Sequence, residues 1–127
     1  MFGGKLTKFC KEVNEVVVAK GFWNGMREAL VALGENPVVD EDIVKATKDA
    51  FIAQKIALIQ SECGEALEAM RKDNYGLEEK DTFEDELADV FIRLADLCGE
   101  LDIDIEKQIE WKLNLNKSRP ALHGKKF

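Results

Sequence analysis

Four acidic residues stand in two pairs whose spacing suits metal chemistry. Glu62 and Glu65 are three residues apart, as are Glu86 and Asp89. Residues three apart on an α-helix lie on one face. Both pairs border apolar residues, at the edge of a core where a charge is costly unless something compensates it. If the two helices pack antiparallel, the four carboxylates can converge on a divalent cation. Ligation by oxygen alone favours Mg²⁺, with Mn²⁺ as a substitute, over zinc.

Acids at this spacing are also common on solvated helix faces. Residues 62–89 hold 11 acidic and three basic residues, and from spacing alone the solvated face is the favoured interpretation. A di-iron bundle would need Glu-x-x-His pairs, whereas the single histidine, His123, lies in the tail. Gly64, within the first acidic pair, would permit close approach of a ligand or a neighbouring helix.

The end of the chain is basic. All 25 acidic residues precede Trp111, which leaves a net charge of −12 in residues 1–110 and +5 in residues 111–127. The overall charge of −7 disfavours binding of long nucleic acids. Cationic and amide donors that suit a phosphate chain cluster here, at Lys112, Asn116, Lys117 and Arg119. The alternative is a helix C-terminus whose bases complement the macrodipole. With Mg²⁺ bridging phosphates to carboxylates, acids and tail become two halves of one site.

The elements that position these residues are helices. Apolar residues recur at spacings of three and four, which predicts an all-α bundle. A length of 127 residues favours a single domain. We expect helices over about 6–20, 26–33, 41–72 and 105–116, and another that starts after Asp81 or Thr82 and weakens at Gly99.

The helix expected over 41–72 carries the first acidic pair. Its apolar stripe follows helical spacing through Ile52, Ile56, Ile59, Cys63, Ala66 and Met70. A helix of this length spans about 50 Å, which is long for a small domain, so a kink or a break before Gln54 is plausible. The stripe places the Cys63 thiol in the core, as it does Cys98 in the next long helix.

Cysteine usage and hydropathy indicate the compartment. The three cysteines are widely spaced and odd in number, which fits reduced thiols. No stretch approaches the ~18 apolar residues of a membrane span, and the amino terminus lacks the apolar core of a signal peptide. We therefore expect a cytoplasmic protein that does not insert into membranes.

Three further residues are candidates for recognising a nucleobase. Phe22 and Trp23 follow the first helix and have rings suited to stacking, although core packing is the favoured interpretation for them. Asn14 has an amide that suits a base edge, or it is simply exposed. Lys55, two helical turns before Glu62, is a weak candidate for a further phosphate contact.

These residues resemble a known family. The run Glu62-Cys63-Gly64-Glu65, twenty intervening residues, and Glu86-Leu87-Ala88-Asp89 look like the ExxE…ExxD signature of the MazG-like, all-α nucleoside triphosphate pyrophosphohydrolases. The ending K-x3-N-K-x-R-P followed by HGKKF resembles that of one bacterial and phage-associated branch, and the resemblance covers about residues 54–127. The fuller family motif begins with two glutamates, and Ser61 stands at the first position here.

The resemblance implies a reaction and a set of roles. The reaction is Mg²⁺-dependent hydrolysis between the α- and β-phosphates of a nucleoside triphosphate, which gives a monophosphate and pyrophosphate and clears surplus or noncanonical nucleotides. It implies Glu62, Glu65, Glu86 and Asp89 as metal ligands, and Glu62 or Glu65 as general base. The four tail donors would hold phosphates, sometimes across a subunit boundary. The fold that the resemblance implies is a four-helix-type bundle of this pyrophosphatase kind, completed by oligomerisation as a homodimer or homotetramer. The rival interpretation is a non-catalytic helical oligomeric interaction module with a solvated or degenerate acidic face.

Overall fold

The chain is all-helical. The computed structural model describes residues 1–36 and 38–126; Pro37, Phe127 and the side chain of His123 lie outside the described part. The helices are α1 (Lys5–Ala19), α2 (Asn24–Gly34), α3 (Glu41–Arg71), α4 (Phe83–Glu100) and α5 (Ile105–Lys117), followed by a short 3₁₀ helix, η1 (Ala121–Gly124). Residues 1–36 and 38–126 contain no strand, so the all-α prediction is confirmed. None of the described helices is long and apolar enough to cross a membrane.

Polar side chains fix where three of the helices begin. The side chains of Asp40, Thr82 and Asp104 each accept a hydrogen bond from the backbone N–H three residues later, at 3.0, 3.3 and 3.1 Å. These bonds satisfy N–H groups that the first helical turn leaves without partners. Asp40 and Asp104 thus cap α3 and α5, and of the two candidates for the start of α4 the cap is Thr82.

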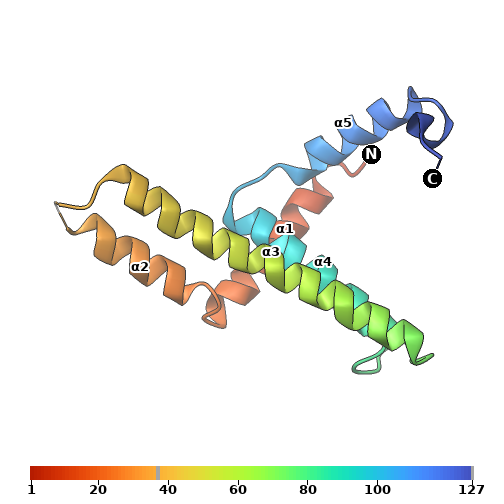
Figure 1. Cartoon of the computed structure of the whole chain (residues 1–127), viewed down its shortest axis with the longest axis horizontal. Helices are drawn as coiled ribbons and strands as arrows, with labels where there is room; N and C mark the ends of the chain where they lie inside the picture. Colours follow the sequence, from red (N-terminus) through yellow and green to blue (C-terminus); the bar gives the residue numbers. More distant parts are fainter. Residues whose placement is uncertain (37, 127) are drawn as a thin grey trace.

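The long helix α3 is the axis of the molecule (Figure 1). It runs unbroken from Glu41 to Arg71, so the helix does not break before Gln54. In Figure 1, α2 lies along the first half of α3, and α4 lies along the second half. No break is needed, because separate partners cover the two halves. Helix α1 packs on α4, and α5 leads away from the other helices beyond its contact with α1.

The core consists of two small groups of buried side chains. Cys10, Ala95 and Cys98 form one, where α1 meets α4; Trp23, Met26 and Leu97 form the other. Helices α1 and α4 approach closely at Gly99, because a Cβ there would lie 2.5 Å from the carbonyl oxygen of Cys10. Helix α4 ends at Glu100, one residue after Gly99, and the glycine permits the close packing of α1 on this end of α4.

The face that α3 buries is rotated relative to the predicted stripe. Glu62, Ala66 and Ala69 are buried, whereas Cys63 is exposed and Met70 is 42% exposed. The prediction of a buried thiol is thus wrong for Cys63 and confirmed for Cys98. The reason is that α4 packs against a stripe that passes through an acidic residue, which an apolar pattern cannot identify. A Cβ added at Gly64 would meet no atom of the described part of the chain within 4 Å, so no described helix packs closely against this glycine.

An apolar surface remains uncovered in the single chain. Several residues that the apolar pattern places inward are at least 38% exposed in the single chain: Phe9 and Val16 of α1, Ile56 and Met70 of α3, Leu87, Phe91 and Leu94 of α4, and Leu113 of α5. On α4 the three exposed residues follow one another at spacings of four and three, so they form one stripe along the helix.

Candidate metal centre and adjoining cavity

Three of the four predicted metal ligands converge where α3 and α4 pack together. Glu62, Glu65 and Glu86 each present a carboxylate oxygen within 4.8 Å of the other two. Glu62 and Glu86 are only 7% and 8% exposed, whereas Glu65 faces solvent. Asp89 lies beside Glu62 on the wall of a cavity, outside the group of three. The expected convergence thus holds for three acids, with the fourth adjacent.

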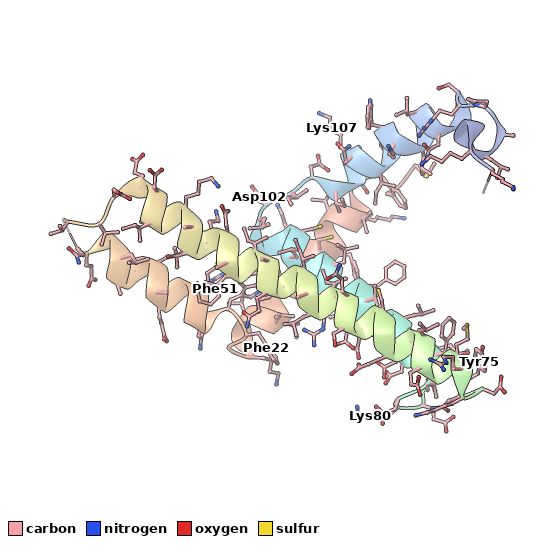
Figure 2. All side chains as sticks on the ribbon, viewed as in Figure 1. Phe22, Phe51, Tyr75, Lys80, Asp102 and Lys107 are labelled. Carbon is pink, nitrogen blue, oxygen red and sulfur yellow. The ribbon has the colours of Figure 1, made fainter. Side chains whose placement is uncertain are left out.

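The turn between α3 and α4 sets the register of these acids. Thr82 is fully buried, and its hydroxyl donates to the carbonyl oxygen of Gly76 at 2.8 Å while capping α4. The rings of Tyr75 and Phe83 meet edge to face with centroids 5.5 Å apart. Figure 2 shows Tyr75 and Lys80 at this end of the α3–α4 pair. The capped turn fixes the start of α4 one helical turn before Glu86.

Arg93 joins the acids, although the spacing of the acidic pairs did not single it out. Its Nε donates to Oε1 of Glu62 at 2.6 Å. This charge-assisted hydrogen bond partly compensates a carboxylate that is almost fully buried. Arg93 lies four residues after Asp89 and seven after Glu86, so helical spacing places it on the acidic face of α4. The helical spacing of Arg93 from Asp89 and Glu86 was therefore the sequence signal that could have identified it.

The crowding of negative charge shifts the protonation of the cluster. Hydrogen bonding to Glu62 and the charges of Glu62 and Glu86 raise the pKa of Glu65 to about 7. Burial acts to raise the pKa of Glu62, but hydrogen bonds from Glu65 and Arg93 outweigh it, so this pKa is lowered. Burial is the main cause that raises the pKa of both Glu86 and Asp89, and the charge of Glu62 adds to it. Near neutral pH, Glu65 therefore carries a proton part of the time. This proton reduces the repulsion among the carboxylates, as an added cation would.

The donor set fits a hard divalent cation. Mg²⁺ prefers carboxylate oxygen and demands few protein ligands, because it keeps several waters. Three converging oxygens, one on a side chain that releases its proton near neutral pH, meet that requirement. A second acidic group, Asp81, Asp85 and Glu86, also brings oxygens within 4.8 Å, but Asp81 is exposed and only Glu86 is buried.

A cavity of about 460 Å³ opens directly beside the acids. Glu62, Asp89 and Arg93 line one part of it, and its apolar wall includes Leu58 and Ile92. Its volume lies within the range of small-molecule sites, which are mostly apolar with a few placed polar groups. The candidate metal centre and a ligand-sized space are therefore contiguous.

Phe22 and Lys55 also line this cavity. Phe22 is 65% exposed and lies in the bend between α1 and α2, beside α3 in Figure 2, so it does not pack in the core. Lys55 Nζ donates to the carbonyl oxygen of Phe22 at 2.8 Å and lies 4.4 Å from the ring centroid of Trp23. These contacts hold Lys55, the candidate for a further phosphate contact, at the edge of the cavity.

Two of the three candidates for base binding, Asn14 and Trp23, lie behind the cavity wall. Trp23 is 1% exposed, and its indole N–H donates to both oxygens of Asp96 at 2.9 and 3.0 Å. Asn14 donates to Asp96 at 3.0 Å and to Glu100 at 2.9 Å. Neither Asn14 nor Trp23 is among the residues that line the cavity, whereas Asp96 is. The two candidates are thus partners of a third residue, which the sequence pattern did not indicate.

The predicted phosphate-binding residues are not brought to the acids within one chain. Lys112, Asn116 and Lys117 lie on α5, and Arg119 follows it. Figure 1 shows α5 leading away from the α3–α4 pair, toward the far end of the molecule. The Oδ1 atom of Asn116 is buried without a hydrogen-bond partner in the described part of the chain.

Comparison with protein-family models, with curated proteins and with solved structures finds no match. The resemblance to MazG-like enzymes therefore rests on the motifs alone and stays a prediction.

Proposed function

We propose that the protein is a Mg²⁺-dependent nucleoside triphosphate pyrophosphohydrolase. The observation that carries the proposal is the convergence of Glu62, Glu65 and Glu86 beside a ligand-sized cavity. Such burial of like charges at a helix interface is unfavourable for folding alone, which is typical of functional sites. The ExxE…ExxD spacing supplies the reaction class: cleavage between the α- and β-phosphates to release a nucleoside monophosphate and pyrophosphate.

The residues divide into distinct roles under this proposal. Glu62, Glu65, Glu86 and Asp89 would hold Mg²⁺, which supplies charge neutralisation and a lowered pKa of bound water. Glu62 and Glu65 are the two candidates for accepting the proton of the attacking water. Of these, Glu65 has the pKa nearer neutrality, and general bases work best when their pKa lies near the operating pH.

We further propose that the site is completed by a second copy of the chain, as a homodimer or as part of a homotetramer. Two observations support this. The tail donors lie on α5 or directly after it, and α5 leads away from the α3–α4 pair that carries the acids. The stripe of Leu87, Phe91 and Leu94 on α4 leaves an apolar surface uncovered next to the acids. A partner packed on this stripe can bring its own α5 toward the cluster, which would close a bundle that one chain leaves open.

The decisive experiment incubates the protein with Mg²⁺ and a panel of nucleoside triphosphates and measures pyrophosphate. We expect release from at least one nucleotide and its loss in Glu65→Gln. If no nucleotide yields pyrophosphate above the Glu65→Gln background, the enzymatic proposal is wrong, and the non-catalytic helical interaction module becomes the better interpretation of the apolar surface.

Subunit mixing tests the shared site. Glu65→Gln and Arg119→Ala are each expected to be inactive alone, because one lacks an acid and the other a phosphate contact. In a two-fold symmetric dimer, random re-association gives half mixed dimers, each with one intact site, so activity returns to about a quarter of wild type. Mixed subunits that stay inactive after verified exchange would place acids and tail of one site on the same chain.

A further inference from the structure

Asp96 is a buried carboxylate on the wall of the cavity, outside the acidic cluster. It is 6% exposed and comes from α4, two turns after Asp89. Oδ1 accepts from Trp23 at 2.9 Å and from Asn14 at 3.0 Å, while Oδ2 shares only the Trp23 N–H, at 3.0 Å. Both donors are neutral, and no salt bridge to Asp96 occurs in residues 1–36 and 38–126.

This arrangement leaves acceptor capacity directed at the cavity. An ionised carboxylate offers about four lone-pair sites, of which the two protein donors occupy only part. A buried carboxylate without a cation is unfavourable unless further donors reach it. Because Asp96 lines the same cavity as Glu62 and Asp89, a ligand that donates to Asp96 can also reach the candidate metal centre.

We propose that Asp96 selects a nucleobase with two adjacent N–H donors, so that guanine nucleotides are the preferred substrates. The inference rests on the proposed function for the statement that the cavity receives a nucleotide. Guanine places N1–H and the 2-amino group side by side, and a carboxylate accepts from both. Trp23 and Asn14 are positioning residues, because they hold Asp96 rather than the base.

The other bases match a carboxylate less well. Uracil and thymine flank their single N–H with two carbonyl oxygens, which would face the negative charge of Asp96. Adenine and cytosine offer an amino group next to an acceptor nitrogen. Sites built from buried polar groups discriminate strongly against ligands that leave those groups without partners. The remaining wall suits the base itself, since Leu58 and Ile92 are apolar and Phe22 offers an exposed ring.

Calorimetric titration with nucleoside monophosphates tests the inference without hydrolysis. In the presence of Mg²⁺, we expect the wild-type chain to bind GMP at least about tenfold more tightly than IMP, which lacks the 2-amino group, or UMP. Equal affinities, or no binding of GMP, would overturn the inference. This comparison needs no variant, so a folding defect cannot obscure it.

The Asp96→Asn variant should weaken the binding of one nucleotide and strengthen the binding of another. Asparagine offers one acceptor and one donor, which match N1–H and the 2-carbonyl of xanthine. We expect about tenfold weaker binding of GMP and tighter binding of XMP, with the melting temperature checked in parallel. A variant that weakens GMP, IMP and UMP equally would show that Asp96 only supports Trp23, and the inference would fail.

The two proposals fail separately. Absence of pyrophosphate with GMP binding that depends on Asp96 would remove the reaction and leave the base selection. Pyrophosphate release with the same kcat/KM for GTP and UTP would keep the reaction and remove the base selection.

Discussion

Arg93 occupies the position of a cation among the acids, and its removal gives the sharpest test of the candidate metal centre. The pair with Glu62 has a donor–acceptor distance of 2.6 Å, and the glutamate side chain is only 10% exposed. Hydrogen bonds to charged groups contribute about 1.5–3 kcal/mol to stability. Because the arginine side chain is 38% exposed, solvent screening reduces this, and we expect Arg93→Ala to lose about 1–2 kcal/mol.

The expected loss depends on the divalent cation. Without metal at pH 8, the melting temperature should fall by about 4–8 °C, at roughly 4 °C per kcal/mol for a chain of this size. With saturating Mg²⁺, the cation takes over the compensation of Glu62, so most of the difference from wild type should disappear. Thermal melts followed by circular dichroism at one fixed protein concentration measure both quantities.

A matched control lies outside the cluster. Arg27 forms a comparable ion pair with the buried side chain of Glu100, at 2.7 Å, and is 49% exposed. Arg27→Ala should lose a similar amount of stability, with no recovery in Mg²⁺. The reasoning is refuted if Arg93→Ala is equally destabilised with and without Mg²⁺, or if Mg²⁺ rescues Arg27→Ala as well. In a Glu62→Gln background, Arg93→Ala should have little effect.

Three further predictions concern single positions. The pKa of Glu65 is about 7 in the folded chain, against 4.5 for an ordinary glutamate, so the folded state holds more protons than the unfolded state between these values. The stability of the metal-free wild-type chain should therefore fall as the pH rises from 4.5 to 7. Metal-free Glu65→Gln should lack this fall in melting temperature. Gly99→Ala should lower the free energy of unfolding by about 1–2 kcal/mol, because a new Cβ meets backbone, whereas Gly64→Ala, in open space, should raise it by about 0.5–1 kcal/mol in urea titrations. Thr82→Ala should lose about 1–2 kcal/mol in the same titrations, because the cap and a buried hydroxyl bond disappear; an unchanged midpoint would contradict this.

The helices were largely predictable from the sequence because local signals determine them. Asp40 and Asp104 have short acceptor side chains at the start of apolar-periodic segments, and both cap helices in the structure. The continuity of α3 through Gln54 was not predictable, since it depends on which helices cover each half. Propensity describes a segment, whereas the choice of partners is a property of the whole chain.

The candidate site was predictable only in part. The spacing of Glu62, Glu65 and Glu86 allowed them to converge if the two helices packed antiparallel, and the structure brings them together, although spacing alone favoured a solvated face. The role of Asp96 was not visible, because a single acid in an apolar segment gives no periodic signal. Its donors, Asn14 and Trp23, come from α1 and from the bend before α2, more than seventy residues away in the sequence.

Burial separates the two interpretations that spacing left open. A solvated acidic face would leave all its carboxylates in water, where like charges are screened and the cost of each is small. Here Glu62 and Glu86 are less than a tenth exposed and face each other across the α3–α4 interface. Apolar residues at these two positions would stabilise the same packing better. The chain therefore keeps charge where packing alone disfavours it, and this placement is what supports the proposed divalent cation between the two helices.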